Sequence, residues 1–318
     1  MHDINLRNCL LCGQETVLFF PENDTLLKCV GCGVVFDESS MLGESYYENE
    51  RVPHVDGKKI ESRRRNAKQR VKLIRKMLKK ESSLIDIGCG EGLFLQDAKN
   101  YVNNVYGIEP TKAYAAYAKE TMNLDVHQGT LESFECPDNS FDMVTMFHVL
   151  EHLSSPSQAL GKIYSWLKKN GHIVIEVPNI ESPTAQHKGL NWELIYPEHR
   201  FYFSPSSLQY LLKKNNFEII SVRFRDFDQY RTGIGTNLRK LGIIFTALKN
   251  KEQPKTAEKH TQTYAPQKSK NSILKGIRRT IQLPLRAFLG WLTMKLKRSD
   301  YILVIAMKVE KINESWEA

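Results

Sequence analysis

The stretch Leu84–Leu95, which reads LIDIGCGEGLFL, decides the fold of this chain. A short apolar run typical of a β-strand leads into an aspartate and three alternating glycines, and an amphipathic pattern follows. Glycines let the chain turn sharply and let a ligand approach bare backbone. The pattern therefore indicates the strand, turn and helix of a nucleotide-binding α/β domain, although a glycine-rich loop alone is a weak signal.

Further strands follow this loop at the spacing of an α/β sheet. A second strand ends at the acid Glu109, about 20 residues after the first glycine, where a ribose diol is bound in such folds. Leu124–Glu132 predicts a third strand with its loop, and Phe141–Leu153 predicts a fourth strand that runs into a helix start. Leu167–Pro178 predicts a helix end with a glycine cap before a fifth strand. The last two strands are expected over Phe217–Val222 and Tyr301–Met307.

The ordered series resembles the class I S-adenosylmethionine (SAM)-dependent methyltransferases over roughly residues 60–228 and 300–310. The resemblance implies an α/β, Rossmann-like sheet of seven strands with SAM as cofactor. The alternative is a Rossmann dehydrogenase, which carries G-x-G-x-x-G where this loop has G-x-G-x-G. By the resemblance, the residues at SAM are Asp86, Gly88, Gly90, Gly92, Glu109, Thr130, Leu131, Phe147 and His148. Glu109 would bind the ribose hydroxyls, because a carboxylate offers a diol a pair of acceptors.

Four of the six cysteines form two C-x2-C pairs near the N-terminus. We expect Cys9, Cys12, Cys29 and Cys32 to bind one structural Zn²⁺, because four thiolates fill a tetrahedral site and leave no position open. A redox pair is the alternative, but it would not need two such pairs. A zinc ribbon ahead of a SAM domain is similar to the architecture of bacterial sugar and glycan methyltransferases.

The domain boundaries follow from these motifs and from an interruption before the last strand. We expect a zinc ribbon over 1–45, the methyltransferase domain over 46–228 and 299–318, and a basic helical insertion with a linker over 229–298. About 75 residues separate the last two strands, far more than an ordinary connection. Within this stretch, residues 231–298 hold sixteen Lys/Arg and two acids. Basic amphipathic stripes are typical of helices that lie on membranes, so residues 236–298 predict contact with an anionic membrane surface. Packing on the main domain or a homodimer interface is the alternative, and nucleic acid is less favoured because few aromatics are available for stacking.

The composition and the hydropathy pattern restrict the class of protein. The 41% apolar and 25% charged residues are ordinary for a globular protein, and no apolar run is long enough to span a bilayer. The first residues show no secretory pattern, so we expect a cytoplasmic protein that the insertion holds at the inner membrane face.

The segment Tyr196–Ser204 follows the fifth strand and supplies the candidate catalytic residues. It resembles the Tyr-His-Glu-His-x-x-Tyr-Phe-Ser stretch of deoxysugar C-methyltransferases, with Pro197 as a departure. By that resemblance Tyr196, Glu198 and His199 lie at the substrate. His199 is the predicted base, because the ordinary pKa of histidine suits proton transfer near neutrality.

A second cluster is His148, Glu151 and His152, which would share one face of a helix. Such a face could bind a divalent metal or hold a base. We expect instead that Glu151 and His152 order the helix start, where an acid is favoured.

These features predict methyl transfer from SAM to a sugar-type acceptor, either a nucleotide sugar or a lipid-linked or surface glycan, with O-methylation favoured over C-methylation. The alternative is an RNA methyltransferase that uses the zinc module and the basic blocks 58–80 and 231–298 to bind RNA. A non-catalytic SAM-fold module would show a damaged glycine loop or lack the ribose acid, and neither is seen.

Overall fold

The computed structural model describes residues 8–40, 57–225 and 299–310, and its strands form two sheets. The larger is a mixed sheet of seven strands in the order β10-β11-β8-β7-β4-β5-β6. The strands are β4 (Ser83–Ile87), β5 (Asn104–Glu109), β6 (Asp125–Gln128), β7 (Phe141–Phe147), β8 (Leu167–Pro178), β10 (Phe217–Arg225) and β11 (Tyr301–Lys308). Five of them pair in parallel, and β11 lies antiparallel between β8 and β10. This is the seven-stranded, Rossmann-like α/β sheet that the sequence predicts.

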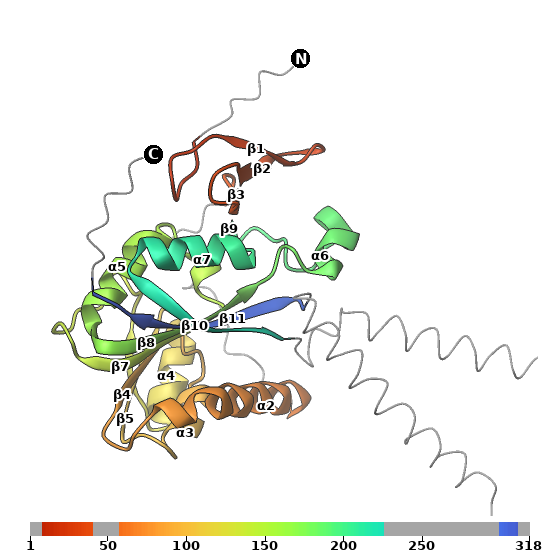
Figure 1. The fold of residues 1–318 in the computed structure, drawn as a ribbon. Coiled ribbons are helices and arrows are strands. Elements are labelled where there is room, and N and C mark those ends of the chain that lie inside the picture. The colour runs from red at the N-terminus through yellow and green to blue at the C-terminus, as the bar shows by residue number, and fades with distance from the viewer. Residues whose placement is uncertain (1–7, 41–56, 226–298, 311–318) are drawn as a thin grey trace, which may run out of the picture.

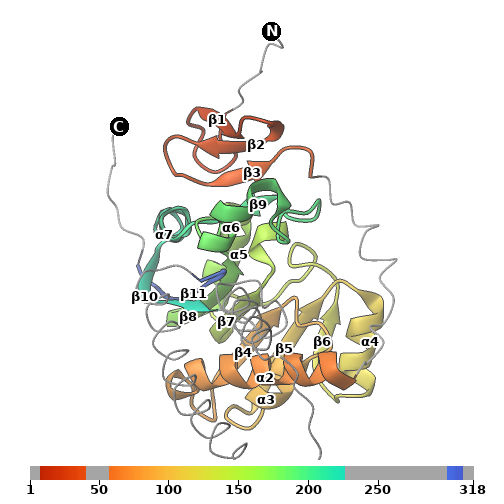
Figure 2. The same ribbon diagram turned by 90° about the vertical axis from the view of Figure 1, so that its right-hand side faces the viewer.

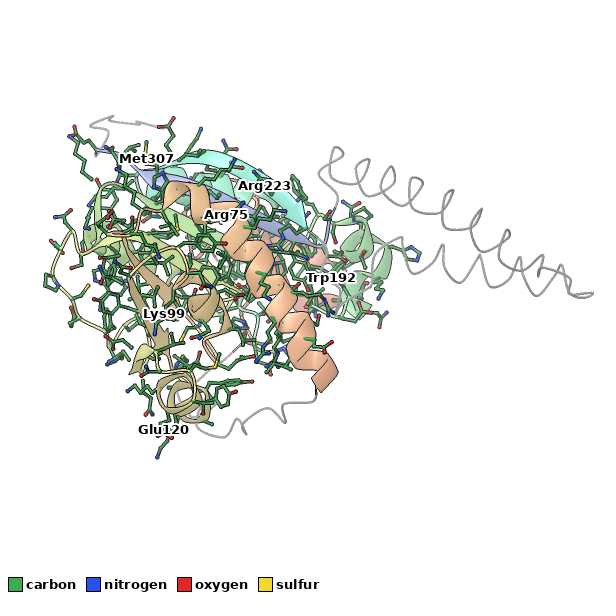
Figure 3. The ribbon with its side chains drawn as sticks, turned by 90° about the horizontal axis from the view of Figure 1, so that it is seen from below. Arg75, Lys99, Glu120, Trp192, Arg223 and Met307 are labelled. Atoms are coloured by element: carbon green, nitrogen blue, oxygen red, sulfur yellow. The ribbon has the colours of Figure 1, made fainter. Side chains whose placement is uncertain are left out.

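Helices cover both faces of this sheet, which explains why its central strands are apolar on both sides (Figure 1). One face carries α2 (Gly57–Ile74), α3 (Leu93–Ala98) and α4 (Lys112–Glu120), and the other carries α5 (Pro156–Trp166), α6 (Pro183–Lys188) and α7 (Pro205–Lys214). Seen from below, α2 runs across its face of the sheet (Figure 3). Each helical layer has its own buried cluster: Val71 and Ile74 belong to one, Leu160 and Leu208 to the other.

Two element boundaries differ from the sequence-based prediction. We expected a helix end at the start of Leu167–Pro178, but α5 ends at Trp166 and β8 begins at once, because Leu167 pairs with Phe141 of β7. Strand β10 continues to Arg225, because Arg225 pairs with Tyr301 at the start of β11.

The smaller sheet joins the N-terminal module to the main domain (Figure 2). It contains β1 (Thr16–Phe20), β2 (Asn23–Cys29), β3 (Val35–Asp37) and β9 (Phe201–Tyr202), and β3 pairs antiparallel with β9. Three further hydrogen bonds cross the same boundary: the Ser40 hydroxyl to the Pro197 carbonyl (2.6 Å), the Asp37 amide to the Arg200 carbonyl (2.9 Å) and the Lys214 ammonium to the Leu11 carbonyl (2.5 Å). The module therefore holds the segment that carries the predicted base.

Three short 3₁₀ helices complete the described elements: η1 (Arg75–Met77), η2 (Leu150–His152) and η3 (Gly189–Asn191). None of the helices in the described ranges has the length and apolar composition needed to span a membrane. The predicted basic insertion over 229–298, with its expected membrane or homodimer contact through 236–298, lies outside the described residues.

Candidate active site and cysteine cluster

A cavity of about 290 Å³ opens beside the glycine-rich loop that follows β4. Its walls come from this loop, from α2, from the ends of β7 and β8, from residues 194–199 and from Tyr301. Seven of the predicted site residues line it: Asp86, Gly88, Gly90, Phe147, His148, Tyr196 and His199. Five others are not among the lining residues: Gly92, Glu109, Thr130, Leu131 and Glu198.

The loop after β4 requires glycine for conformation and for space. Gly88, Gly90 and Gly92 have φ angles of +70°, +54° and +82°, in the left-handed region that disfavours side chains. A Cβ on Gly88 would lie 2.5 Å from Cγ2 of Val149, and one on Gly92 would lie 2.3 Å from Cδ1 of Leu124. Gly92 therefore serves packing under the loop rather than the cavity wall.

Glu109 lies behind this loop and is almost fully buried. Its Oε2 accepts a 2.8 Å hydrogen bond from the Gly90 amide, and its Oε1 accepts one of 2.9 Å from the Thr111 amide. These bonds fix the carboxylate between the loop and the start of α4. The Gly129 amide donates to the Glu109 carbonyl, which places Thr130 and the buried Leu131 on the neighbouring loop after β6.

Asp86 is the penultimate residue of β4, within its buried run, and lines the cavity. Its Oδ1 accepts a 2.6 Å hydrogen bond from the Thr145 hydroxyl on the adjacent strand β7. Burial raises the pKa of Asp86 to about 7, because a charged carboxylate is poorly solvated there.

The sequence analysis did not identify one charged residue beside the cavity, Glu176. Glu176 on β8 is fully buried and lies 3.1 Å from Arg70 Nε and 2.8 Å from Arg225 Nη1. Burial opposes its ionisation, but Arg70 in particular lowers the pKa of Glu176 to about 2. The Arg70 guanidinium also lies over the Phe147 ring, 4.3 Å from its centroid. An acid inside an otherwise apolar strand was the available signal, but the sequence does not identify its partners.

His148 is not on a helix, contrary to the predicted arrangement. Its φ of +61° places it in a left-handed turn between β7 and the short η2 helix. Its Nδ1 lies 3.4 Å from Glu151 Oε1 and its Nε2 lies 3.3 Å from Glu176 Oε1. Although burial disfavours a charged imidazole, these two acids raise the pKa of His148.

His199 is buried in the segment that the N-terminal module holds. Its Nδ1 lies 2.8 Å from the Leu194 carbonyl, and its ring lies against that of Tyr196 with centroids 3.9 Å apart and planes tilted by 36°. Burial lowers the pKa of His199 to about 4. The structure gives Glu198 a backbone role, since its carbonyl lies 2.8 Å from His152 Nδ1.

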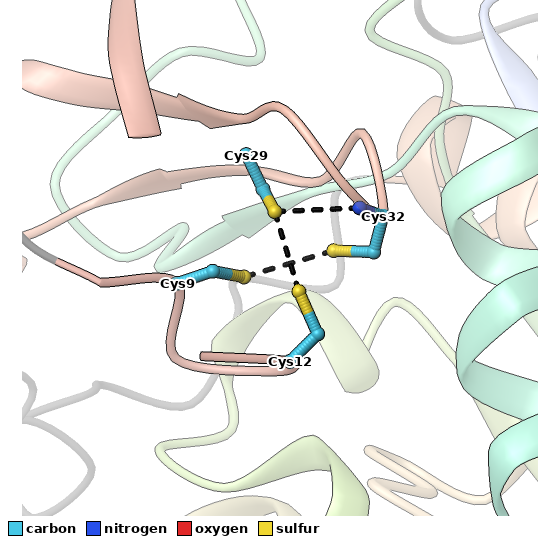
Figure 4. A group of neighbouring side chains, drawn as sticks. All are labelled: Cys9, Cys12, Cys29 and Cys32. Atoms are coloured by element: carbon cyan, nitrogen blue, oxygen red, sulfur yellow. Dashed lines mark hydrogen bonds between the residues drawn. The ribbon is translucent and has the colours of Figure 1, made fainter. Parts of the chain in front are cut away.

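The four N-terminal cysteines converge (Figure 4). Their sulfur atoms all lie within 4.8 Å of one another, with Sγ–Sγ distances of 3.6 Å for Cys9–Cys32 and 3.3 Å for Cys12–Cys29. Sulfurs about 2.3 Å from a tetrahedral zinc ion would be about 3.8 Å apart, so this donor set fits zinc. The Leu11 amide points at Cys9 Sγ and the Cys32 amide at Cys29 Sγ, each at 3.3 Å. A hydrogen bond from the Cys32 thiol lowers the pKa of Cys9 to about 5.

Comparison with known proteins identifies the larger sheet and its helices. A family model described as a methyltransferase domain matches residues 60–222. A probable SAM-dependent methyltransferase of Mycolicibacterium smegmatis is 27% identical over 138 residues, which cover 43% of this chain and 52% of that protein. The mitochondrial ubiquinone biosynthesis O-methyltransferase of Saccharomyces cerevisiae is 31% identical over 155 residues, or 46% and 48% of the two chains. The chain thus spans about half the length of these curated relatives.

Among solved structures, the fold is similar to a chain in the complex between the Haloferax volcanii Trm112 methyltransferase activator and a putative methyltransferase. The TM-score is 0.50 at 12% identity, and the match covers 84% of this chain and 97% of that one.

Proposed function

Since this chain belongs to the methyltransferase-domain family and is a SAM-dependent methyltransferase, we propose that it methylates a hydroxyl group of a sugar-type acceptor. The acceptor would be a nucleotide sugar or a lipid-linked or surface glycan. The observation that carries the proposal is that Tyr196 and His199 line the same cavity as the glycine loop. The sugar class rests on the likeness of their segment to deoxysugar methyltransferases. The match to proteins named ubiquinone biosynthesis O-methyltransferases favours oxygen as the methylated atom.

The residues around the glycine loop fit SAM by their chemistry. When bound, SAM supplies an electrophilic methyl group on its sulfonium and leaves as S-adenosylhomocysteine. Gly88 and Gly90 present backbone without side chains to the cavity. Glu109, whose carboxylate is held by two amide hydrogen bonds, is the proposed partner of the ribose hydroxyls. We place Thr130 and Leu131 beside the adenine, on the loop next to Glu109.

His199 is the proposed proton acceptor. A carbonyl oxygen can only accept, so the contact with Leu194 places the ring proton on Nδ1 and leaves the Nε2 lone pair available. The lowered pKa keeps the imidazole neutral at physiological pH. When the acceptor hydroxyl is methylated, His199 Nε2 would take up the proton that its oxygen gives up. Glu151 Oε1 lies 3.9 Å from Nε2 and favours the imidazolium that results.

The cysteine cluster is proposed to bind structural zinc through Cys9, Cys12, Cys29 and Cys32. Four thiolates leave the ion no open position, so its role would be to fold the module. Because β3 of this module pairs with β9, the metal would act on catalysis by holding residues 196–202 in place. We further propose that residues 236–298 bring the cytoplasmic enzyme to an anionic membrane surface, where lipid-linked acceptors are found.

The test is transfer of labelled methyl from SAM into a cell extract by the full chain, followed by separation of RNA, lipid and soluble sugars. We expect label in the sugar or lipid fraction. The Glu109→Ala variant should lose this label, because the Gly90 and Thr111 amides would lose their acceptor. Label confined to RNA would overturn the sugar proposal and favour the RNA methyltransferase alternative.

A further inference from the structure

We propose that Glu151, His152 and His199 form a binding site for a divalent transition-metal cation beside the SAM cavity. One ligand atom of each residue lies within 4.8 Å of the others. Glu151 and His152 belong to η2, and His199 reaches them from the segment that the N-terminal module holds. This cluster is separate from the four cysteines and binds its cation whatever the acceptor is.

Both imidazoles are oriented as metal ligands. His199 Nδ1 lies 2.8 Å from the Leu194 carbonyl, and His152 Nδ1 lies 2.8 Å from the Glu198 carbonyl. Carbonyl oxygens only accept hydrogen bonds, so each Nδ1 carries the proton and each Nε2 keeps its lone pair. Histidines that bind metals commonly donate their second ring N–H to a backbone carbonyl in this way. The two rings are 4.7 Å apart by their centroids.

Glu151 is a buried carboxylate that lacks a strong partner. Its side chain is 0% exposed, and neither oxygen accepts a hydrogen bond of good geometry. Glu176 has Arg70 and Arg225, whereas no arginine or lysine in the described ranges pairs with Glu151. The imidazole of His148, with Nδ1 3.4 Å from Glu151 Oε1, is shared with Glu176. Burying a carboxylate in this way is costly, and a bound cation would remove that cost.

The donor set selects the class of cation. Two imidazole nitrogens and one carboxylate oxygen suit Zn²⁺, Fe²⁺, Co²⁺ or Mn²⁺, whereas Mg²⁺ and Ca²⁺ prefer oxygen ligands. Three protein ligands leave coordination positions open. His199 also lines the cavity, so an oxygen of the acceptor could occupy an open position on that side. A cation on Nε2 excludes a proton there, so His199 would accept the proton itself only in the metal-free enzyme.

Cobalt titration of the full chain, with the four-cysteine module already loaded with zinc, tests this site. Co²⁺ bound to nitrogen and oxygen gives visible absorption without the thiolate bands that a cysteine site would add. We expect one such Co²⁺ per chain. The Glu151→Gln and His152→Ala variants should bind it roughly tenfold more weakly or worse. His187→Ala, which changes an exposed histidine outside the cluster, should bind it normally.

Because Glu151 is buried, SAM affinity of each variant serves as the check of the fold. His152 is only partly buried, so its variant keeps the test usable if Glu151→Gln does not fold. Absence of the signal at millimolar Co²⁺, or equal binding by wild type and both folded variants, would overturn the site. The titration needs no acceptor, so failure of the sugar proposal would leave its outcome unchanged.

Discussion

Phe36 of β3 pairs with Phe201 of β9, two residues after the candidate base His199. Both phenylalanines are buried, with ring centroids 6.3 Å apart. The N-terminal module is thereby built into the support of the site, although its cysteines lie outside the cavity lining. Loss of the proposed zinc should therefore affect turnover more than SAM binding.

The Cys12→Ser variant tests this relationship. Removing one thiolate should unfold the module, lower the melting temperature and reduce turnover by up to about 100-fold, since displacements near 1 Å can cost that much. SAM affinity should change little, because no hydrogen bond within the described residues joins the glycine loop to the module. Cys136→Ser is the matched control, as Cys136 lies outside the cluster. Unchanged turnover in Cys12→Ser would contradict a supporting role.

Gly88→Ala should weaken SAM binding by roughly tenfold or more. The substitution forces a side chain into the left-handed region, at a cost of ~1–2 kcal/mol, and brings its Cβ against Val149. Gly161 offers the control, because it lies in α5 with no atom within 4 Å of an added Cβ. Gly161→Ala should leave SAM affinity unchanged and stabilise the helix by about 0.5–1 kcal/mol. Calorimetric titration with SAM and thermal unfolding would measure both effects, and equal SAM affinity in the two variants would refute the assignment of the loop.

Stability should fall between about pH 4 and pH 7 through Asp86. The folded chain binds the Asp86 proton more tightly than the unfolded chain, because burial raises the pKa of this group to about 7. The stabilisation is therefore complete below the ordinary pKa near 4 and is lost as pH rises through 7. Asp86→Asn should remove this part of the pH dependence, measured by urea unfolding without SAM.

Asp142 provides a control of opposite sign. Burial opposes its ionisation, but Lys168 and the Ser83 amide lower the pKa of Asp142. Its stabilisation is present above the ordinary pKa and is lost on acidification, so Asp142→Asn should be most harmful at neutral pH. If the free energy of unfolding varied with pH in the same way in wild type and Asp86→Asn between pH 4 and pH 7, the raised pKa of Asp86 would be contradicted.

Sequence reasoning located the parts of the site that are local in the chain. The glycine loop follows β4 and Glu109 is the last residue of β5, so spacing alone predicts that they meet at the ends of parallel strands. The spacing of the two C-x2-C pairs likewise predicts that the four cysteines lie together. Non-local relationships were not accessible: β9 has only two residues, and its pairing with β3 joins distant segments.

His148 illustrates a second limit. The sequence placed it on a helix with Glu151, but the turn after β7 adopts a left-handed conformation there. Its backbone amide donates to the Glu176 carbonyl at 2.9 Å, and its ring lies between two buried acids. Tertiary contacts with β8 thus determine a backbone conformation that local helical spacing could not predict.

His199→Gln should spare SAM binding and lower turnover by ~10²–10⁴-fold, the usual contribution of a positioned base. Glutamine retains a donor for the Leu194 carbonyl but cannot take up a proton. With a pKa of about 4, the wild-type His199 imidazole is already mostly neutral at pH 5. The turnover of the metal-free enzyme should therefore not change through His199 between pH 5 and pH 8. It should fall only as the pH drops toward 4. Labelled-methyl transfer at saturating SAM, with His187→Gln as the control, measures both properties. Full activity in His199→Gln would exclude this role for the buried imidazole. The role would also be excluded if metal-free wild-type activity fell around the ordinary pKa of histidine and this pH dependence were absent in His199→Gln.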